Sequence, residues 1–153
     1  MNIQLRPWDM EDAMALHQMS MHPYYLKKRP WKFLCPDTFL NACATIQFYQ
    51  QADKNRYVYR AITVDDSVCG LLNAVKRSAG AWELSYWLAV NQWHRGIMRQ
   101  ALALLCEEMF QNPNVMVLYA CVNEQNIASC MVLRQNGFIE DKEGSIRIFR
   151  RYR

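Results

Sequence analysis

The chain has 153 residues, of which 52% are hydrophobic and 21% are charged, and its formal net charge is +4. This length is typical of one domain, and the composition excludes disordered and collagen-like chains. No apolar run approaches the roughly 18 residues of a membrane span, and the N-terminus lacks a secretory signal, so we expect a single domain over residues 1–153 with no membrane partner.

The first part of the chain predicts a strand followed by helices. Residues 3–6 form a short strand that Pro7 ends, and Asp9 caps the helix that follows, with Asp12 completing an imperfect capping box. Residues 21–36 contain prolines, aromatic residues and basic residues, which predict an irregular segment with a short helical turn. Apolar residues recur with helical spacing over residues 37–51 and predict a second helix.

The middle of the chain predicts three strands. Residues 57–64 and 68–76 are rich in β-branched and aromatic residues and flank a turn at Asp65-Asp66-Ser67, so they predict a hairpin. Residues 82–90 (WELSYWLAV) are apolar on both faces except at Glu83 and Ser85. That pattern is typical of a central strand covered by helices on both sides.

The last third alternates helices and strands. Residues 97–110 carry an apolar helical stripe, and residues 115–122 (VMVLYACV) predict another buried strand. A helix from Asn126 ends at Gly137, which supplies the left-handed residue after a helix. Residues 138–140 and 145–153 close the chain as a hairpin. This order predicts an α/β (α+β) fold, a mixed sheet with helices on both faces, and a parallel crossover over residues 82–122.

The cysteines and histidines indicate a reducing compartment and no metal site. The chain has six cysteines, none of them in a CxxC pair, and most lie in apolar runs. We therefore expect free, buried thiols and a cytoplasmic protein. The three histidines, His17, His22 and His94, do not have ligand spacing to the cysteines.

The segment from Trp93 to Met98 joins a predicted strand to a predicted helix. A helix N-terminus presents unpaired N–H groups and the positive end of the helix dipole, which together favour an anion. Gly96 would let the backbone approach a phosphate closely, and Arg95 and Arg99 add positive charge. The segment lacks the glycines of a P-loop or a dinucleotide fingerprint, and by itself it is also compatible with a simple turn.

Three segments, in this order, resemble the GNAT superfamily and within it the ribosomal-protein N-terminal acetyltransferases. They are LRPWDMEDA (5–13), ELSYWLAVNQWHRGIMRQAL (83–102) and NIASCMVLRQNGF (126–138). The second resembles the family's strand, pyrophosphate loop and helix, and the third its N-x-x-S helix ending in Gly-Phe. The resemblance implies a single GNAT-like domain with a mostly antiparallel sheet of about seven strands, whose central strands diverge between Leu88 and residues 115–122.

The resemblance also implies an N-acetyltransferase that uses acetyl-CoA as cosubstrate and no metal. Glu83 would be the general base, and Ser129 would face the thioester sulfur. Backbone groups of Leu88 and Val90 would pair with the pantetheine arm of CoA. The implied residues for binding acetyl-CoA are Leu88, Val90, His94, Arg95, Gly96, Ile97, Met98, Arg99, Asn126 and Ser129, of which His94 to Arg99 would bind the pyrophosphate through their N–H groups.

Three positions depart from the family pattern. The family often has a glycine in place of His94 and a small residue in place of Met98, so Met98 has to turn into the core. Leu133 replaces the tyrosine that acts as general acid in many members. An amine of pKa about 10.4 needs a base, whereas a thiol of pKa about 8.5 can leave with little help. A hydrogen bond from Ser129 would then suffice.

Simpler interpretations stay open for these residues. Asn126 would serve equally as a helix cap, Ser129 as a solvated hydroxyl, and Glu83 as a charge at a strand end. Tyr86 and Trp87 are interpreted as core or pocket wall. A non-catalytic module that binds and senses acetyl-CoA is the alternative to an enzyme.

The sequence leaves the amine acceptor open between a protein N-terminus and a small molecule. Four positive charges in the aromatic stretch at residues 24–33 suit an acceptor that carries carboxylates or phosphates. Weak nucleic-acid contact is a less favoured interpretation, and a homodimer is compatible with the sequence. The basic residues concerned are Lys27, Lys28, Arg29 and Lys32, with Arg147, Arg150, Arg151 and Arg153.

Overall fold

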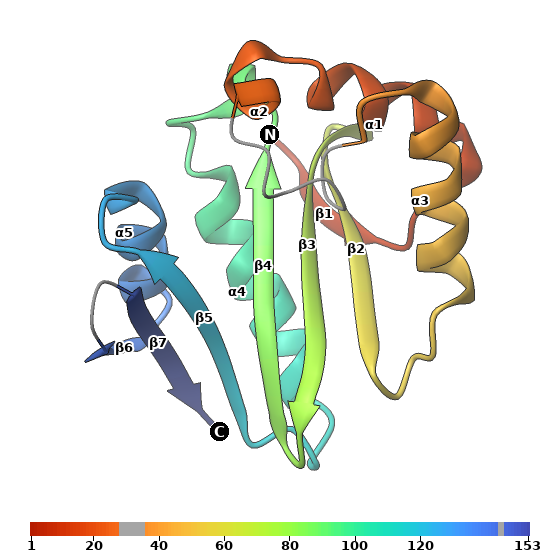
Figure 1. Cartoon of the computed structure of the whole chain (residues 1–153). Helices are drawn as coiled ribbons and strands as arrows, with labels where there is room; N and C mark the ends of the chain where they lie inside the picture. Colours follow the sequence, from red (N-terminus) through yellow and green to blue (C-terminus); the bar gives the residue numbers. More distant parts are fainter. Residues whose placement is uncertain (28–35, 144–145) are drawn as a thin grey trace.

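The computed structural model describes residues 1–27, 36–143 and 146–153, and it is built on a seven-stranded sheet in the order β1-β2-β3-β4-β5-β7-β6 (Figure 1). Every neighbouring pair is antiparallel except β4 and β5, which are parallel. The mixed, mostly antiparallel sheet predicted from the sequence is therefore confirmed. The strands are β1 (Ile3–Arg6), β2 (Tyr57–Val64), β3 (Ser67–Ser78), β4 (Ala81–Leu88), β5 (Val117–Asn123), β6 (Ile139–Glu143) and β7 (Ile146–Tyr152).

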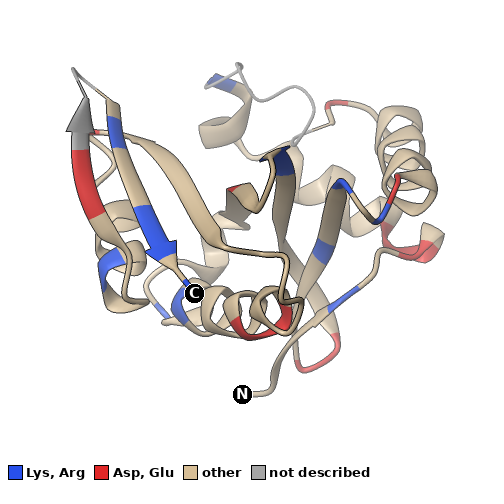
Figure 2. Cartoon of the chain, turned by 90° about the horizontal axis from the view of Figure 1, so that it is seen from below, with Lys and Arg blue, Asp and Glu red and all other residues tan. Residues whose placement is uncertain are grey.

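Helices cover both faces of the sheet, as predicted (Figures 1 and 2). The helices α4 (Ile97–Phe110) and α5 (Ile127–Gln135) build the core on one face. The other face carries α1 (Ala13–Ser20), α2 (Pro23–Lys27) and α3 (Phe39–Gln51). Two short 3-10 turns, η1 (Met10–Asp12) and η2 (Val90–Gln92), complete the described elements. No helix among them is long and apolar enough to cross a membrane.

Side chains alternate between these two cores along the central strands. On β3, Leu72 packs toward α4 and α5, whereas its neighbour Leu71 packs with Trp87 beneath α1 and α3. Because residues directly opposite in a sheet share a face, each position on β2, β3 and β4 can be assigned to one helical layer. The face on which a side chain of β4 lies therefore determines which helices and strands it can meet.

Two strands differ from the sequence prediction. The strand expected at residues 82–90 ends at Leu88, because Val90 belongs to η2, where its C=O accepts a hydrogen bond from Trp93 N–H (3.2 Å). The strand expected at residues 115–122 runs over Val117–Asn123 and alternates between buried and more exposed positions. It is buried on one face only, so Cys121 is exposed instead of buried.

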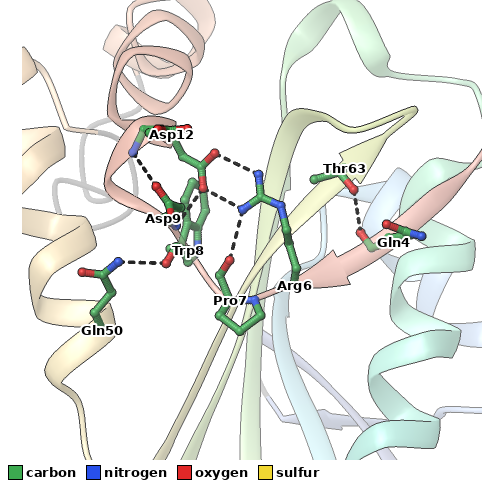
Figure 3. A network of polar contacts seen from close by, with 9 residues as sticks. Gln4, Arg6, Pro7, Trp8, Asp9, Asp12, Gln50 and Thr63 are labelled. Atoms are coloured by element: carbon green, nitrogen blue, oxygen red, sulfur yellow. Dashed lines mark hydrogen bonds and ion pairs between the residues drawn. The ribbon is translucent and has the colours of Figure 1, made fainter.

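A buried carboxylate ties the first strand to the helices above the sheet (Figure 3). Arg6 donates two hydrogen bonds to Asp12, of 2.8 and 2.9 Å, and the N–H of Asp9 donates a third of 2.9 Å. Gln50 of α3 donates to the C=O of Trp8 (3.0 Å). The capping box at Asp9 is complete, not imperfect as predicted, and it begins η1 before α1 follows.

The charge on Asp12 follows from these bonds. Burial by itself disfavours its ionised form, but the hydrogen bonds from Arg6 and from Asp9 N–H outweigh burial and lower the pKa of Asp12. A carboxyl group whose pKa is lower in the folded than in the unfolded state stabilises the fold above its unfolded pKa of about 3.9. That stabilisation is lost as the pH falls through the folded-state pKa.

We expect Asp12→Asn to lower the free energy of unfolding at pH 7 by about 1–3 kcal/mol, because Arg6 loses its charged partner. The difference from wild type should shrink as the pH falls below about 4. Denaturant unfolding between pH 2 and 7 measures it. Glu11→Gln, an exposed change on the same turn, is the control, and a difference independent of pH would contradict the assignment.

Candidate functional site

The strands β4 and β5 pair over only three residues and then diverge (Figure 1). The last pair is Glu83 with Tyr119, after which β5 continues along β7 as far as Asn123. The N–H of Ala89 donates to the C=O of Cys69 on β3 (2.7 Å). By strand alternation, the backbone groups of Leu88 therefore point away from β3, toward the side on which β5 has departed. This is the divergence that the resemblance implied.

The carbonyl groups at the end of β4 already have partners within the chain. Leu88 C=O accepts hydrogen bonds from Trp93 Nε1 (3.1 Å) and from the hydroxyl of buried Tyr25. Val90 C=O accepts from Trp93 N–H within η2. Trp93 and Tyr25 thus fix the point at which β4 leaves the sheet, and neither was assigned a role from the sequence.

The N-terminus of α4 is open. Gly96 is its N-cap at φ +74°, with no side-chain cap, and a Cβ atom at Gly96 would meet nothing within 4 Å. The first-turn N–H groups have no acceptor inside the helix, and no acidic residue lies in that turn. Arg95 and Arg99 are exposed beside it. Unpaired donors, the helix dipole and two guanidinium groups make this terminus suited to an anion.

The side chains of the loop explain two departures from the family pattern. His94 has φ +61°, a left-handed conformation that glycine adopts more easily. Met98 is only 8% exposed and packs in the core beside Ile97, so the expectation that it turns inward is confirmed. Ile97 and Met98 therefore present only backbone N–H groups to the open side of the loop.

We expect His94→Gly to leave stability unchanged or raise it by about 1 kcal/mol, because the left-handed conformation strains a non-glycine residue. Gly96→Ala should lower stability by a similar amount for the same reason. Equilibrium denaturation measures both changes. The comparison of the two variants is decisive, because Gly96→Ala should lower the stability and His94→Gly should not. Destabilisation by His94→Gly would mean that the imidazole makes a stabilising contact.

Ser129 is oriented by a tyrosine from β4. Its hydroxyl lies 2.6 Å from that of Tyr86, and its N–H donates to Asn126 Oδ1 (3.2 Å), so Asn126 is the N-cap of α5. Burial raises the pKa of Tyr86 to about 12, so the phenol stays protonated near neutrality. Tyr86 can therefore donate to Ser129 and leave the Ser129 hydrogen for another acceptor. The sequence interpretation of Tyr86 as core or wall missed this contact, since the two residues lie far apart in the chain.

The position of the family's usual tyrosine offers no proton donor. Leu133 is fully buried and packs with Cys130 in the core beneath α5. The first turn of α5 does carry a hydroxyl group, that of Ser129, which lies against the hydroxyl of Tyr86.

Glu83 faces the other side of β4 and is surrounded by polar groups from neighbouring strands. Arg77 donates to its carboxylate (3.0 Å), and the Sγ of Cys121 lies 3.9 Å from it. Burial, and then the negative charge of Glu83, raise the pKa of Tyr119. Glu83 and Ser129 thus approach the divergence from opposite faces of the sheet. Arg77, Tyr119 and Cys121 were not predicted because β3 and β5 supply them.

Free thiols and metal ligands do not form a cluster here. Cys69, Cys106 and Cys130 are buried, as predicted, and burial raises the pKa of Cys69 to about 11. Within the described ranges, no group of three His, Cys, Asp or Glu side chains could hold a metal ion. The side chains around Glu83 supply a carboxylate, a guanidinium and a thiol, and Ser129 and Tyr86 supply hydroxyl groups on the other face.

The arginines that kept an RNA interaction open are engaged within the chain, and basic residues alternate with acidic ones in Figure 2. Lys27 is exposed at the end of α2, whereas Lys28, Arg29 and Lys32 lie outside the described residues. Arg147 pairs with Glu140, Arg150 with Asp141, Arg151 donates to Asn136 C=O, and Arg153 donates to Val115 C=O. Such bonds compete with the phosphate contacts that nucleic-acid binding needs.

The family described as acetyltransferase (GNAT) domain matches residues 2–139. Comparison with curated proteins gives no match by sequence. Among solved structures, RimL, a ribosomal L7/L12 α-N-protein acetyltransferase in complex with coenzyme A, has a TM-score of 0.78 at 20% identity, over 98% of this chain and 93% of that one. RimJ of Mycobacterium smegmatis has a TM-score of 0.80 at 20% identity, over 98% of this chain and 81% of that one. The microcin C7 self-immunity acetyltransferase MccE, in complex with acetyl-CoA and AMP, has a TM-score of 0.84 at 14% identity, over 99% of this chain and 92% of that one.

Proposed function

The chain belongs to the GNAT family of acetyl-CoA-dependent N-acetyltransferases, and we propose that it transfers the acetyl group to a primary amine by direct attack while both substrates are bound. The open N-terminus of α4, at the place where β4 and β5 diverge, carries this proposal. The loop presents donors to an anion, while a carboxylate and a hydroxyl approach the divergence from its two faces. Direct transfer requires such an arrangement because no covalent intermediate forms on the enzyme.

We assign the pyrophosphate of acetyl-CoA to the N–H groups from His94 to Arg99. Arg95 is held by Gln92, so Arg99 is the side chain that is better able to move toward a bound phosphate. The pantetheine arm would lie along β4 near Leu88 and Val90. Since both carbonyls are already engaged within the chain, pairing there would rely on backbone N–H groups. Asn126 would contribute by holding the first turn of α5.

Bound acetyl-CoA supplies an activated acetyl group and a thiolate leaving group. Glu83 removes a proton from the acceptor, because an amine of pKa about 10.4 enters as an ammonium ion at neutral pH. The neutral nitrogen then forms the C–N bond as the C–S bond breaks, and the second proton that the nitrogen loses passes to the departing thiolate, while Glu83 releases the first to solvent. Ser129, oriented by Tyr86, donates to the departing sulfur, and a thiol of pKa about 8.5 needs no stronger acid. Leu133 is therefore compatible with catalysis.

We propose a protein N-terminus or a small amine bearing anionic groups as the acceptor. Arg77 beside Glu83 and exposed Lys27 at the end of α2 support this, because both would repel a polyamine. Structural similarity does not decide the question, since neighbours with the same fold are named for acting on a ribosomal protein, on spermidine and on an aminoglycoside.

Acetyl-CoA at about a hundred times its dissociation constant should stabilise the folded protein by about 2.7 kcal/mol. Arg99→Glu, which reverses a charge beside the open helix terminus, should weaken binding about tenfold and remove about 1.4 kcal/mol of that gain. Thermal unfolding with and without acetyl-CoA measures both. Arg56→Glu makes the same charge change at an exposed site before β2 and should keep the full gain. No stabilisation of wild type at millimolar acetyl-CoA would refute the proposed function.

Glu83→Gln should lower kcat by about 100-fold or more while leaving the stabilisation by acetyl-CoA intact, because general-base catalysis contributes a factor of this size. Release of the CoA thiol in the presence of an amine measures turnover. Glu107→Gln on the exposed side of α4 is the matched control. Unchanged turnover in Glu83→Gln would remove this carboxylate from the mechanism. Stabilisation of wild type without turnover of any amine would favour the non-catalytic sensing alternative.

A further inference from the structure

One buried side-chain amide oxygen of the sheet has no partner among the described residues. Asn73 in the middle of β3 is 1% exposed, and its side-chain oxygen accepts no hydrogen bond from any described group. Burying an unpaired amide lowers stability, and an apolar side chain of the same shape would avoid that loss. A buried unpaired polar group therefore requires an explanation, and a ligand that supplies the missing donor is one.

The register of the sheet places Asn73 beside the proposed general base. Asn73 lies directly opposite Ser85 of β4, two residue pairs from the pair of Val75 with Glu83. Its own strand neighbour Leu71 packs beneath α1 and α3, so Asn73, Ser85 and Glu83 share that face of the sheet. Opposite residues in a sheet have Cβ atoms about 5 Å apart, and alternate residues on a strand lie about 7 Å apart. Side chains at this spacing can converge on one small group.

The three side chains share one chemical property, which is that each can present an oxygen as a hydrogen-bond acceptor. A primary ammonium ion has three N–H donors and no acceptor. Tyr59, opposite Asn73 on β2, adds an aromatic side chain beside these three residues. Its ring is stacked on Tyr49 of α3 at a centroid distance of 4.3 Å, so the side chain is held in place by the helical layer.

We propose that Asn73, Ser85 and Glu83 together bind the acceptor nitrogen, and that Asn73 makes the enzyme select primary over N-methylated amines. The inference rests on the proposed function, since it describes the second substrate of the same reaction. As the ammonium donates one proton to the Glu83 carboxylate, the neutral amine keeps two N–H groups for Asn73 and Ser85 and directs its lone pair at the thioester. A secondary amine has one N–H fewer and leaves one buried oxygen unpaired, which such sites penalise strongly.

Asn73→Leu replaces the amide with an apolar side chain that branches at the same carbon. We expect the variant to melt at the same or a higher temperature than wild type and to retain the stabilisation by acetyl-CoA. Its KM for the amine should rise at least tenfold, and the preference for a primary amine over its N-methyl derivative should fall about tenfold. The probes are propylamine, β-alanine and an alanine-initiated tripeptide amide, each with its N-methylated counterpart, followed by release of the CoA thiol.

Two variants separate binding from structure. Asn73→Asp keeps oxygen acceptors and should retain the preference for primary amines, although a buried carboxylate lowers its melting temperature. Thr63→Val removes another almost fully buried polar group, which in this case has a partner in Gln4 C=O (3.5 Å), and it should leave both KM and the preference unchanged.

The proposal is overturned if Asn73→Leu turns over amines with the KM and the preference of wild type, whether or not the variant loses thermal stability. That result would make Asn73 a structural residue only. Failure of the proposed function is recognised separately, because wild type would then show neither stabilisation by acetyl-CoA nor turnover of any of the three amines.

Discussion

The short pairing between β4 and β5 is the constraint on which the rest of the site depends. These strands are joined through only three residue pairs, whereas β5 pairs with β7 over seven. The second interaction therefore carries β5, and α5 after it, away from β4. Backbone groups that a continuous sheet would pair are left along the edge of β4, next to the uncapped terminus of α4. The proposed binding region therefore exists because the two strands of the parallel crossover do not stay together.

The helical layer above the sheet completes the site by covering only part of one face. The ion pair of Arg6 with Asp12 and the bond from Gln50 hold η1, α1 and α3 against β1. These helices bury Leu71 and Trp87 but leave the Glu83 end of β4 half-buried. The same helices hold the aromatic side chains in place and leave the polar side chains around Glu83 partly exposed. Stability of the fold and access to the proposed acceptor site therefore both depend on where this helical layer ends.

The residues proposed for the two proton transfers lie on opposite faces of β4. Alternation along the strand sends Glu83 toward the proposed acceptor side and Tyr86 toward α5, where it meets Ser129. The sequence already allowed for a missing tyrosine at Leu133, but the pairing of Tyr86 with Ser129 became visible only when β4 and α5 were brought together.

Local pattern in the sequence determined the order of elements, the helix caps at Asn126 and Gly137, the inward turn of Met98 and the glycine at the start of α4, because each depends on residues close in the chain. It placed the end of β4 two residues late at Val90 and wrongly expected Cys121 to be buried. Tertiary structure alone decided the groups around Glu83, the contact between Tyr86 and Ser129, and the position of Asn73 opposite Ser85. These depend on strand register and on which face each helix covers, and residues far apart in sequence carry no local signal of either.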